Sequence, residues 1–122
     1  MFNVLIVCSW GKNRSVYLAS YLGQKGYPVK YGGIYTESDN QITQELVDWA
    51  NIVIFVQPQT KRDFEEQFRI NKQKVIILDV EDRIAVLAPE KENITPEEWT
   101  KIQQEKVYPE LEKQIDKHLP FT

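Results

Sequence analysis

The fold is decided by one segment near the N-terminus, Val4-Leu5-Ile6-Val7-Cys8-Ser9-Trp10-Gly11-Lys12-Asn13-Arg14-Ser15. It opens with a continuous apolar run, which is typical of a central strand buried on both faces of a parallel sheet. The run ends at Cys8, the only cysteine of the chain, and Arg14 follows six positions later, where a helix is expected to begin. The segment therefore predicts a strand, a short loop and the first turn of a helix, with a thiol and a guanidinium at the two ends of the loop.

The loop between Cys8 and Arg14 is suited to binding a tetrahedral oxyanion. Its five residues can surround such an anion with backbone N–H groups, and the positive end of the following helix adds to the attraction. Arginine supplies a planar fork that grips two oxygens at once. The same field should hold Cys8 as a thiolate, with Ser15 placed to hydrogen-bond the sulfur. The candidate phosphate-binding residues are Ser9, Trp10, Gly11, Lys12, Asn13, Arg14 and Ser15.

Strand and helix patterns alternate along the chain, which favours an α/β fold with a parallel sheet covered by helices on both faces. Short apolar runs predict four strands, at 2–7, 29–31, 52–56 and 75–78. Apolar residues at helical spacing predict helices at 15–24, 42–50 and 60–69. The stretch 85–93 is expected to form a long surface loop.

The C-terminal third opens with a strong helix start signal. Thr95 has the place of the cap, Pro96 that of the first helical residue and Glu98 that of a capping-box glutamate. Pro109 lies inside the helix that follows and should kink or divide it, because proline removes a backbone donor. The apolar stripe of this helix is predicted to consist of Trp99, Ile102, Leu111, Ile115 and Leu119.

Composition limits the class of protein. With 122 residues, of which 42% are hydrophobic, the chain is long enough for one compact domain, 1–122, and too short for two. The net charge of −3 is spread over interspersed acidic and basic residues, which argues against a nucleic-acid partner. No run approaches the roughly 20 apolar residues of a membrane span. A lone cysteine excludes an internal disulfide, and a thiolate enzyme favours a reducing compartment, so we expect a soluble cytoplasmic protein without a membrane partner.

Two stretches resemble the low-molecular-weight protein tyrosine phosphatases, and in particular a short bacterial branch of predicted phosphatases. The first is Cys8, five residues, then Arg14-Ser15 after the first strand; the second is Leu46-Val47-Asp48-Trp49-Ala50-Asn51-Ile52-Val53-Ile54-Phe55-Val56. The resemblance runs over 2–82. It implies one phosphatase-like domain, a three-layer α/β sandwich with a four-stranded parallel sheet in the order 2-1-3-4. The active loop would lie at the carboxyl end of the first strand.

The resemblance also implies a reaction. Cys8 would attack a phosphomonoester to give a phosphocysteine that water hydrolyses, with Arg14 clamping the transition state and Ser15 as partner of the thiolate. The family protonates the leaving oxygen with an aspartate after the fourth strand, usually followed by proline. Asp79 has the matching place and is preferred, although Val80 follows it; Asp82 is the second candidate, and a turn-capping role for either is the alternative. The substrate would be a phosphorylated protein or a small aryl phosphate, with no cofactor.

The chain departs from the family pattern in ways that bear on specificity. Gly11 stands where many members have a loop-bracing asparagine, and the second loop cysteine of some members is absent. No aromatic residue that would wall a tyrosine pocket occurs at 80–84, so Trp10 is the nearest candidate to stack on a substrate ring, with Tyr35 a weaker one.

Other readings of Cys8 differ in class. It can be a small buried hydrophobic residue, or the phosphorylated cysteine of a carrier resembling the IIB components of sugar phosphotransferase systems, although those generally lack an equivalent of Arg14. A non-catalytic phosphate- or phosphoprotein-binding domain is a further alternative. Arsenate reduction would need more cysteines, and Gly11-Lys12 does not complete a nucleotide-binding loop. The only histidine, His118, has no partner for a zinc-type site, so no metal is predicted.

Overall fold

The computed structural model describes residues 2–35, 40–91 and 93–121. In chain order its elements are β1 Val4–Cys8, α1 Arg14–Gln24, β2 Val29–Gly33, α2 Gln44–Trp49, β3 Ile52–Phe55, α3 Pro58–Glu65, β4 Lys74–Ile77, α4 Ile84–Leu87, α5 Pro96–Ile102, the π-helical turn η1 Gln103–Val107 and α6 Tyr108–Asp116.

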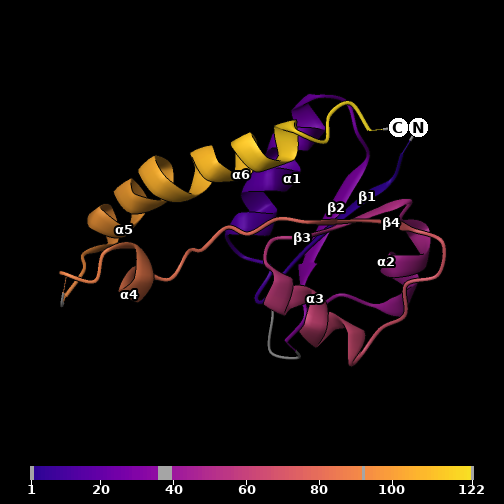
Figure 1. Ribbon diagram of the computed structural model, residues 1–122, viewed down its shortest axis with the longest axis horizontal. Coiled ribbons are helices and arrows are strands. Elements are labelled where there is room, and N and C mark those ends of the chain that lie inside the picture. The colour runs from indigo at the N-terminus through magenta and orange to yellow at the C-terminus, as the bar shows by residue number, and fades with distance from the viewer. Residues whose placement is uncertain (1, 36–39, 92, 122) are drawn as a thin grey trace.

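The four strands form one parallel sheet in the order β2-β1-β3-β4. Helices α1 and α6 cover one face of this sheet, and α2 and α3 lie on the other (Figure 1). The α/β class, the three layers and the strand order are therefore confirmed. Because all strands run in the same direction, their carboxyl ends meet at one edge, where β1 lies between β2 and β3.

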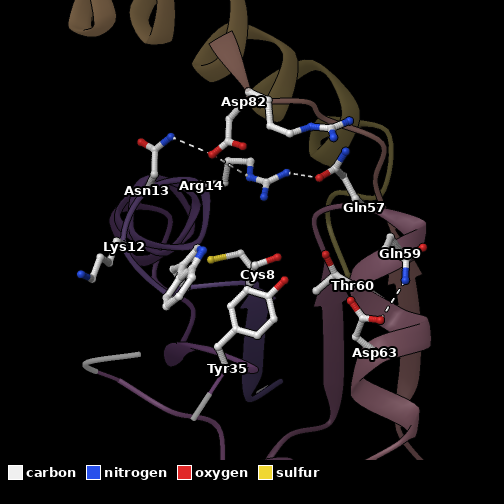
Figure 2. A pocket seen from close by; sticks show the side chains of 13 residues that line it. Cys8, Lys12, Asn13, Arg14, Tyr35, Gln57, Gln59, Thr60, Asp63 and Asp82 are labelled. Carbon is white, nitrogen blue, oxygen red and sulfur yellow. Dashed lines mark hydrogen bonds and ion pairs between the residues drawn. The ribbon is translucent and has the colours of Figure 1, made fainter. Parts of the chain in front are cut away.

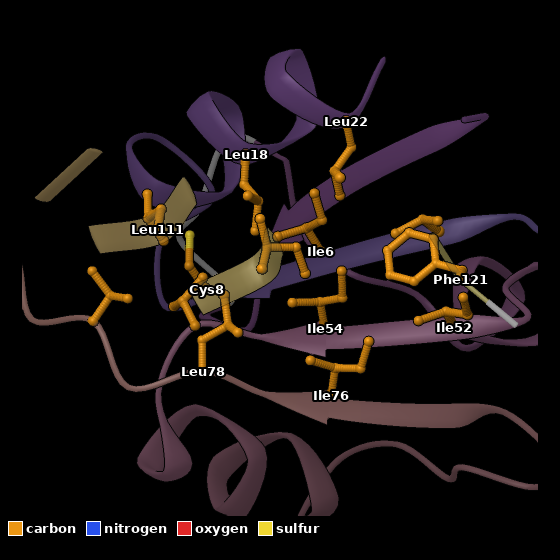
Figure 3. Packing of buried hydrophobic residues seen from close by; sticks show 14 of the residues in the cluster. Ile6, Cys8, Leu18, Leu22, Ile52, Ile54, Ile76, Leu78, Leu111 and Phe121 are labelled. Carbon is orange, nitrogen blue, oxygen red and sulfur yellow. The ribbon is translucent and has the colours of Figure 1, made fainter. Parts of the chain in front are cut away.

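β1 is a central strand, and every one of its residues is buried. Successive side chains of a strand point to opposite faces, so Ile6 and Cys8 pack with residues of α1 and α6, whereas Leu5 and Val7 pack with residues of α2 and α3. Figure 3 shows the first of these clusters, with Cys8 among its apolar side chains. Each large aliphatic residue buried in this way stabilises the fold by roughly 1.5–3 kcal/mol, and β1 contributes to both layers.

The stretch expected as a loop at 85–93 begins instead with a helical turn, α4. The carbonyl of Arg83 accepts hydrogen bonds from the N–H groups of Val86 and Leu87, at 3.1 and 3.0 Å. The turn ends at Ala88, because the residue before a proline is driven away from helical dihedral angles and Pro89 follows. The prediction was wrong for these first residues.

The capping box at Thr95 is confirmed: its side chain accepts from the Glu98 N–H at 3.1 Å, and the Glu98 carboxylate accepts from the Thr95 N–H. Trp99, expected in the buried stripe, is 37% exposed. The reason is that α5 extends beyond the sheet, as Figure 1 shows, so the sheet does not cover this side chain.

Pro109 divides the C-terminal helix through the turn η1, which joins α5 to α6. Proline has no N–H to donate to the carbonyl four residues back, and its ring would clash with that carbonyl, here that of Glu105. A π-helical turn, with bonds between residues five apart, widens the helix just before this point. Its last bond runs from the Tyr108 N–H to the Gln103 carbonyl.

None of the helices in the described parts of the chain combines the length and the apolar character that a membrane crossing requires.

Candidate active site

The loop after β1 is fixed by close packing against the end of β2. Gly11 has φ +70°, and a Cβ on it would lie 2.7 Å from the backbone nitrogen of Gly33. A Cβ on Gly33 would in turn lie 2.5 Å from the Trp10 carbonyl carbon, so only glycines allow this contact. The Ile34 N–H donates to the carbonyl oxygens of Cys8 and Ser9, at 3.2 and 3.0 Å. The loop is thus braced from β2.

The Cys8 side chain lies at the floor of this loop. Its sulfur accepts a hydrogen bond from the Gly11 N–H at 3.0 Å and lies 3.0 Å from the hydroxyl oxygen of the buried Ser15. Both groups can donate to a sulfur that carries negative charge. The sulfur also faces the N-terminal turn of α1, whose dipole favours an anion.

Arg14 is the first residue of α1, and it is 6% exposed. One terminal nitrogen, Nη1, donates to the side-chain oxygen of Gln57 and, at 2.7 Å, to the carbonyl of Val80. Nε lies 3.2 Å from the Asp82 carboxylate. In Figure 2 the guanidinium lies between Cys8 and Asp82. It is therefore held by residues that follow β3 and β4, at the same edge of the sheet as the cysteine.

The sulfur and the guanidinium line one pocket of about 590 Å³. Its wall on one side is aromatic: Trp10 and Tyr35 meet edge to face with ring centroids 4.6 Å apart, and they are 48% and 39% exposed. Figure 2 shows α3 across from this pair. The residues that line the pocket are Cys8, Ser9, Trp10, Lys12, Asn13, Arg14, Tyr35, Gln57, Gln59, Thr60, Asp63, Asp82 and Arg83.

The two candidate acids lie in different places. Asp79 is exposed and does not line this pocket; its backbone N–H and carbonyl are bonded to the Gln114 side chain of α6, at 2.8 and 3.0 Å. Asp82 lines the pocket beside Arg14. Gln114 holds the backbone of Asp79 against α6, outside the pocket. Asp82, three residues further along the chain, is the candidate acid that lines the pocket.

Glu81 shapes the segment that carries Asp82. Its carboxylate accepts the N–H groups of Asp82 and Arg83, both at 3.0 Å, and pairs with the Arg83 guanidinium. The hydrogen bonds from the Arg83 side chain, more than any other contact, lower the pKa of Glu81 to about 2. This charged carboxylate therefore fixes the turn at the pocket edge.

Asn13 connects the loop to the C-terminal helix. Its Nδ2 donates to Gln103 Oε1 at 2.6 Å and to Asp82 Oδ2 at 3.3 Å, and its Oδ1 accepts from the Tyr108 hydroxyl at 2.8 Å. Sequence reasoning named Asn13 but neither Gln103 nor Tyr108. It also missed Gln57, for which a signal existed, because this polar residue directly follows a buried strand.

Gly11 and Ser15 contact the sulfur without lining the pocket. His118 lies in the exposed turn after α6. Within residues 2–35, 40–91 and 93–121, no three His, Cys, Asp or Glu side chains gather in a group that can hold a metal ion.

Comparison with family models and with curated proteins finds no match. Among solved structures, YwlE arginine phosphatase from Geobacillus stearothermophilus is similar over 100% of this chain and 98% of its own, with 20% identity and a TM-score of 0.59. A low molecular weight protein tyrosine phosphatase from T. tengcongensis aligns with 96% of this chain and 99% of its own, with 17% identity and a TM-score of 0.62.

A third solved structure is a cysteine-to-serine mutant of YwlE arginine phosphatase with a phosphorylated active-site serine. It covers 98% of this chain and 96% of its own, with 16% identity and a TM-score of 0.60. All three match nearly end to end, so the likeness includes the C-terminal helix as well as the sheet. The chain therefore has the fold of the low-molecular-weight protein tyrosine phosphatases.

Proposed function

We propose that the chain is a phosphomonoester hydrolase that works through a phosphocysteine on Cys8. The observation that carries the proposal is the shared pocket: a sulfur contacted by two groups able to donate hydrogen bonds lies beside a buried guanidinium. A tetrahedral phosphate between them would be stabilised by the positive charge of Arg14 and by the N-terminal end of the α1 dipole.

In the first step the Cys8 thiolate attacks phosphorus, and the bond from phosphorus to the leaving oxygen breaks. Arg14 and the loop N–H groups bind the non-bridging oxygens, where charge is spread in the transition state. Asp82 donates its proton to the leaving oxygen. In the second step water attacks the phosphocysteine, Asp82 takes the proton from water, and the sulfur leaves as a thiolate that Ser15 hydrogen-bonds.

Asp82 is proposed as the acid in place of the preferred sequence candidate, Asp79. A general acid must reach within about 3 Å of the leaving oxygen in the bound complex. Asp82 lines the pocket that holds the sulfur, whereas Asp79 lies outside it with its backbone tied to α6.

The fold neighbours support the same chemistry. Each is named as a phosphatase, and in one a serine in place of the cysteine carries a phosphoryl group. We propose a phosphorylated protein or a small aryl phosphate as substrate, because the Trp10 and Tyr35 rings can pack against a planar group. We also propose that the protein works in the cytoplasm, where a catalytic thiol stays reduced.

The test compares wild type with Cys8→Ser on an aryl phosphate, a phosphotyrosine peptide and phosphoarginine, which two neighbours' names suggest as a probe. Ser20→Ala, a change on the exposed surface of α1, is the control. We expect wild type and the control to release phosphate, vanadate to compete, and Cys8→Ser to lose at least a thousandfold, because its hydroxyl is a far weaker nucleophile. Phosphate that moves from Cys8 to a protein acceptor but not to water would indicate a carrier, and binding without turnover a non-catalytic domain.

A further inference from the structure

The side chain of Asn13 is engaged at both ends of its amide. Nδ2 has two hydrogens and donates to Gln103 and Asp82, while Oδ1 accepts from Tyr108. The orientation of the amide follows from its partners. Burial, reinforced by the Asp82 carboxylate, raises the pKa of Tyr108, so its hydroxyl stays protonated and can donate. Asp82 Oδ2 accepts from Asn13, so the Nδ2 end of the amide faces Asp82.

The turn η1 explains how two helical residues reach one amide. Gln103 and Tyr108 are five positions apart, and residues at that spacing do not share a face of an α-helix. The π-type bond joins these two residues, from the Tyr108 N–H to the Gln103 carbonyl. Both side chains therefore point to Asn13. Pro109 favours this widened turn, so the cause lies in the sequence directly after it.

Gln103 is held in place at a cost. It is fully buried, and within the described residues its Nε2 has no hydrogen-bond partner. Buried amide groups are otherwise nearly always paired. Its Oε1 makes the shortest of the Asn13 contacts, at 2.6 Å. Gln103 is therefore buried with only its Oε1 hydrogen-bonded, and that bond goes to Asn13. This points to a role of Gln103 in orienting the Asn13 amide.

In the described parts of the chain, Asn13 Nδ2 donates a hydrogen bond to Asp82 Oδ2, and Arg14 Nε lies 3.2 Å from the same oxygen as an ion pair without hydrogen-bond geometry. Because Oδ2 accepts the Asn13 N–H, a proton carried by this carboxyl group sits on the other oxygen, Oδ1. We propose that Asn13, clamped by Gln103 and Tyr108, is a positioning residue that holds Asp82 with Oδ1 available to protonate the leaving group; this inference rests on the proposed function. Asn13 acts through Asp82 and through no contact of its own with the leaving oxygen.

The test measures kcat/KM for aryl phosphates whose phenols range from unsubstituted to dinitro-substituted, since kcat/KM reports the formation of phosphocysteine. The variants are Asp82→Asn, Asn13→Ala, their double mutant and Tyr108→Phe. A dinitrophenolate leaves without help from an acid, whereas a phenolate needs the proton. We expect Asn13→Ala to lose about tenfold on phenyl phosphate and under about threefold on the dinitrophenyl ester. Tyr108→Phe should also lower kcat/KM on phenyl phosphate more than on the dinitrophenyl ester, but by smaller factors than Asn13→Ala.

The double mutant decides whether Asn13 acts through Asp82. If it does, adding Asn13→Ala to Asp82→Asn lowers kcat/KM no further. Tyr21→Phe is the matched control, because it removes a tyrosine hydroxyl bonded to Asp116 of α6 and leaves Asn13 untouched. It should match wild type.

An equal loss for all leaving groups, or additive losses in the double mutant, would overturn the inference and assign Asn13 to the loop structure alone. If Asn13→Ala does not fold by circular dichroism, Tyr108→Phe decides, since it keeps the ring stacked on Tyr17. A wild type that hydrolyses no phosphate ester would overturn the proposed function, and this inference with it. If wild type is active and Asp82→Asn shows a steep dependence on the leaving group but Asn13→Ala does not, this inference is overturned and the proposed function stands.

Discussion

At the scale of single residues, Gly11 decides whether the loop can close. Its φ is positive, and a Cβ on it would lie only 2.7 Å from the backbone nitrogen of Gly33, so there is no room for a side chain. Gly23, in α1, is the opposite case, because a Cβ there would have no atom within 4 Å. One glycine is required by its surroundings, and the other only weakens its helix.

We predict that Gly11→Ala lowers the free energy of unfolding by about 1–3 kcal/mol, since the backbone is strained and β2 must shift. Gly23→Ala should raise it by about 0.5–1 kcal/mol. Urea unfolding followed by circular dichroism measures both. Equal effects of the same sign would contradict the packing of the loop against β2.

Asp79 and Asp82 provide a matched pair for the general acid. Asp82→Asn should lower kcat/KM on phenyl phosphate by about a hundredfold and on dinitrophenyl phosphate by only a few-fold, because only the poor leaving group needs the proton. Asp79→Asn should stay within about twofold of wild type on both, since its side chain lies outside the pocket. A uniform loss in Asp82→Asn would instead identify Asp82 as an anchor of Arg14.

At the scale of elements, the turn 79–83 responds to pH through Glu81. The pKa of Glu81 is lowered from 4.5 to about 2 in the folded protein, so this carboxylate contributes stability above pH 4.5 that is lost as the pH falls through 2. Thermal melts between pH 5 and pH 2 should show Glu81→Gln losing less stability on acidification than wild type. If the melting temperature falls with pH at the same slope in both proteins, the pairing of Glu81 with Arg83 is contradicted.

The pairing of α1 with α6 responds at the other end of the pH range. Hydrogen bonds to Glu112 and Asp116 raise the pKa values of Tyr17 and Tyr21, each to about 12. A raised pKa means that the stabilisation is complete below pH 10 and is lost as the pH rises through 12. Between pH 9 and pH 11.5, the melting temperature should fall more steeply with pH for wild type than for the double variant Tyr17→Phe, Tyr21→Phe. Parallel curves would exclude these bonds.

The sequence predicted the sheet well because its strands are short apolar runs between clear breakers, as β1 and β3 show. It also identified Cys8 and Arg14, which lie in one segment. Gln103 left no comparable signal. Its contact with Asn13 spans 90 positions and depends on η1, which breaks the helical period on which pattern reading relies. The separation of Asp79 from Asp82 likewise depends on Gln114, a residue of a distant helix.

At the scale of the whole molecule, the site is an outcome of strand order. With β1 between β2 and β3, the cysteine at its end pairs with Gly33 of β2. Gln57, which follows β3, bonds to Arg14, and the segment after β4 supplies Asp82. The C-terminal helix then reaches back to Asn13 from across the α1 face (Figure 1). Every layer of the fold thus contributes to one pocket.

The most direct test of this account is to mix wild-type protein with an aryl phosphate, quench it in acid within milliseconds and locate the phosphoryl group by peptide mass spectrometry. Asp82→Asn is examined alongside, because the variant hydrolyses the intermediate more slowly and more phosphocysteine accumulates before the quench. The account predicts one phosphoryl group on Cys8 that forms and decays at rates consistent with turnover. Release of phosphate with Cys8 unmodified throughout would contradict it.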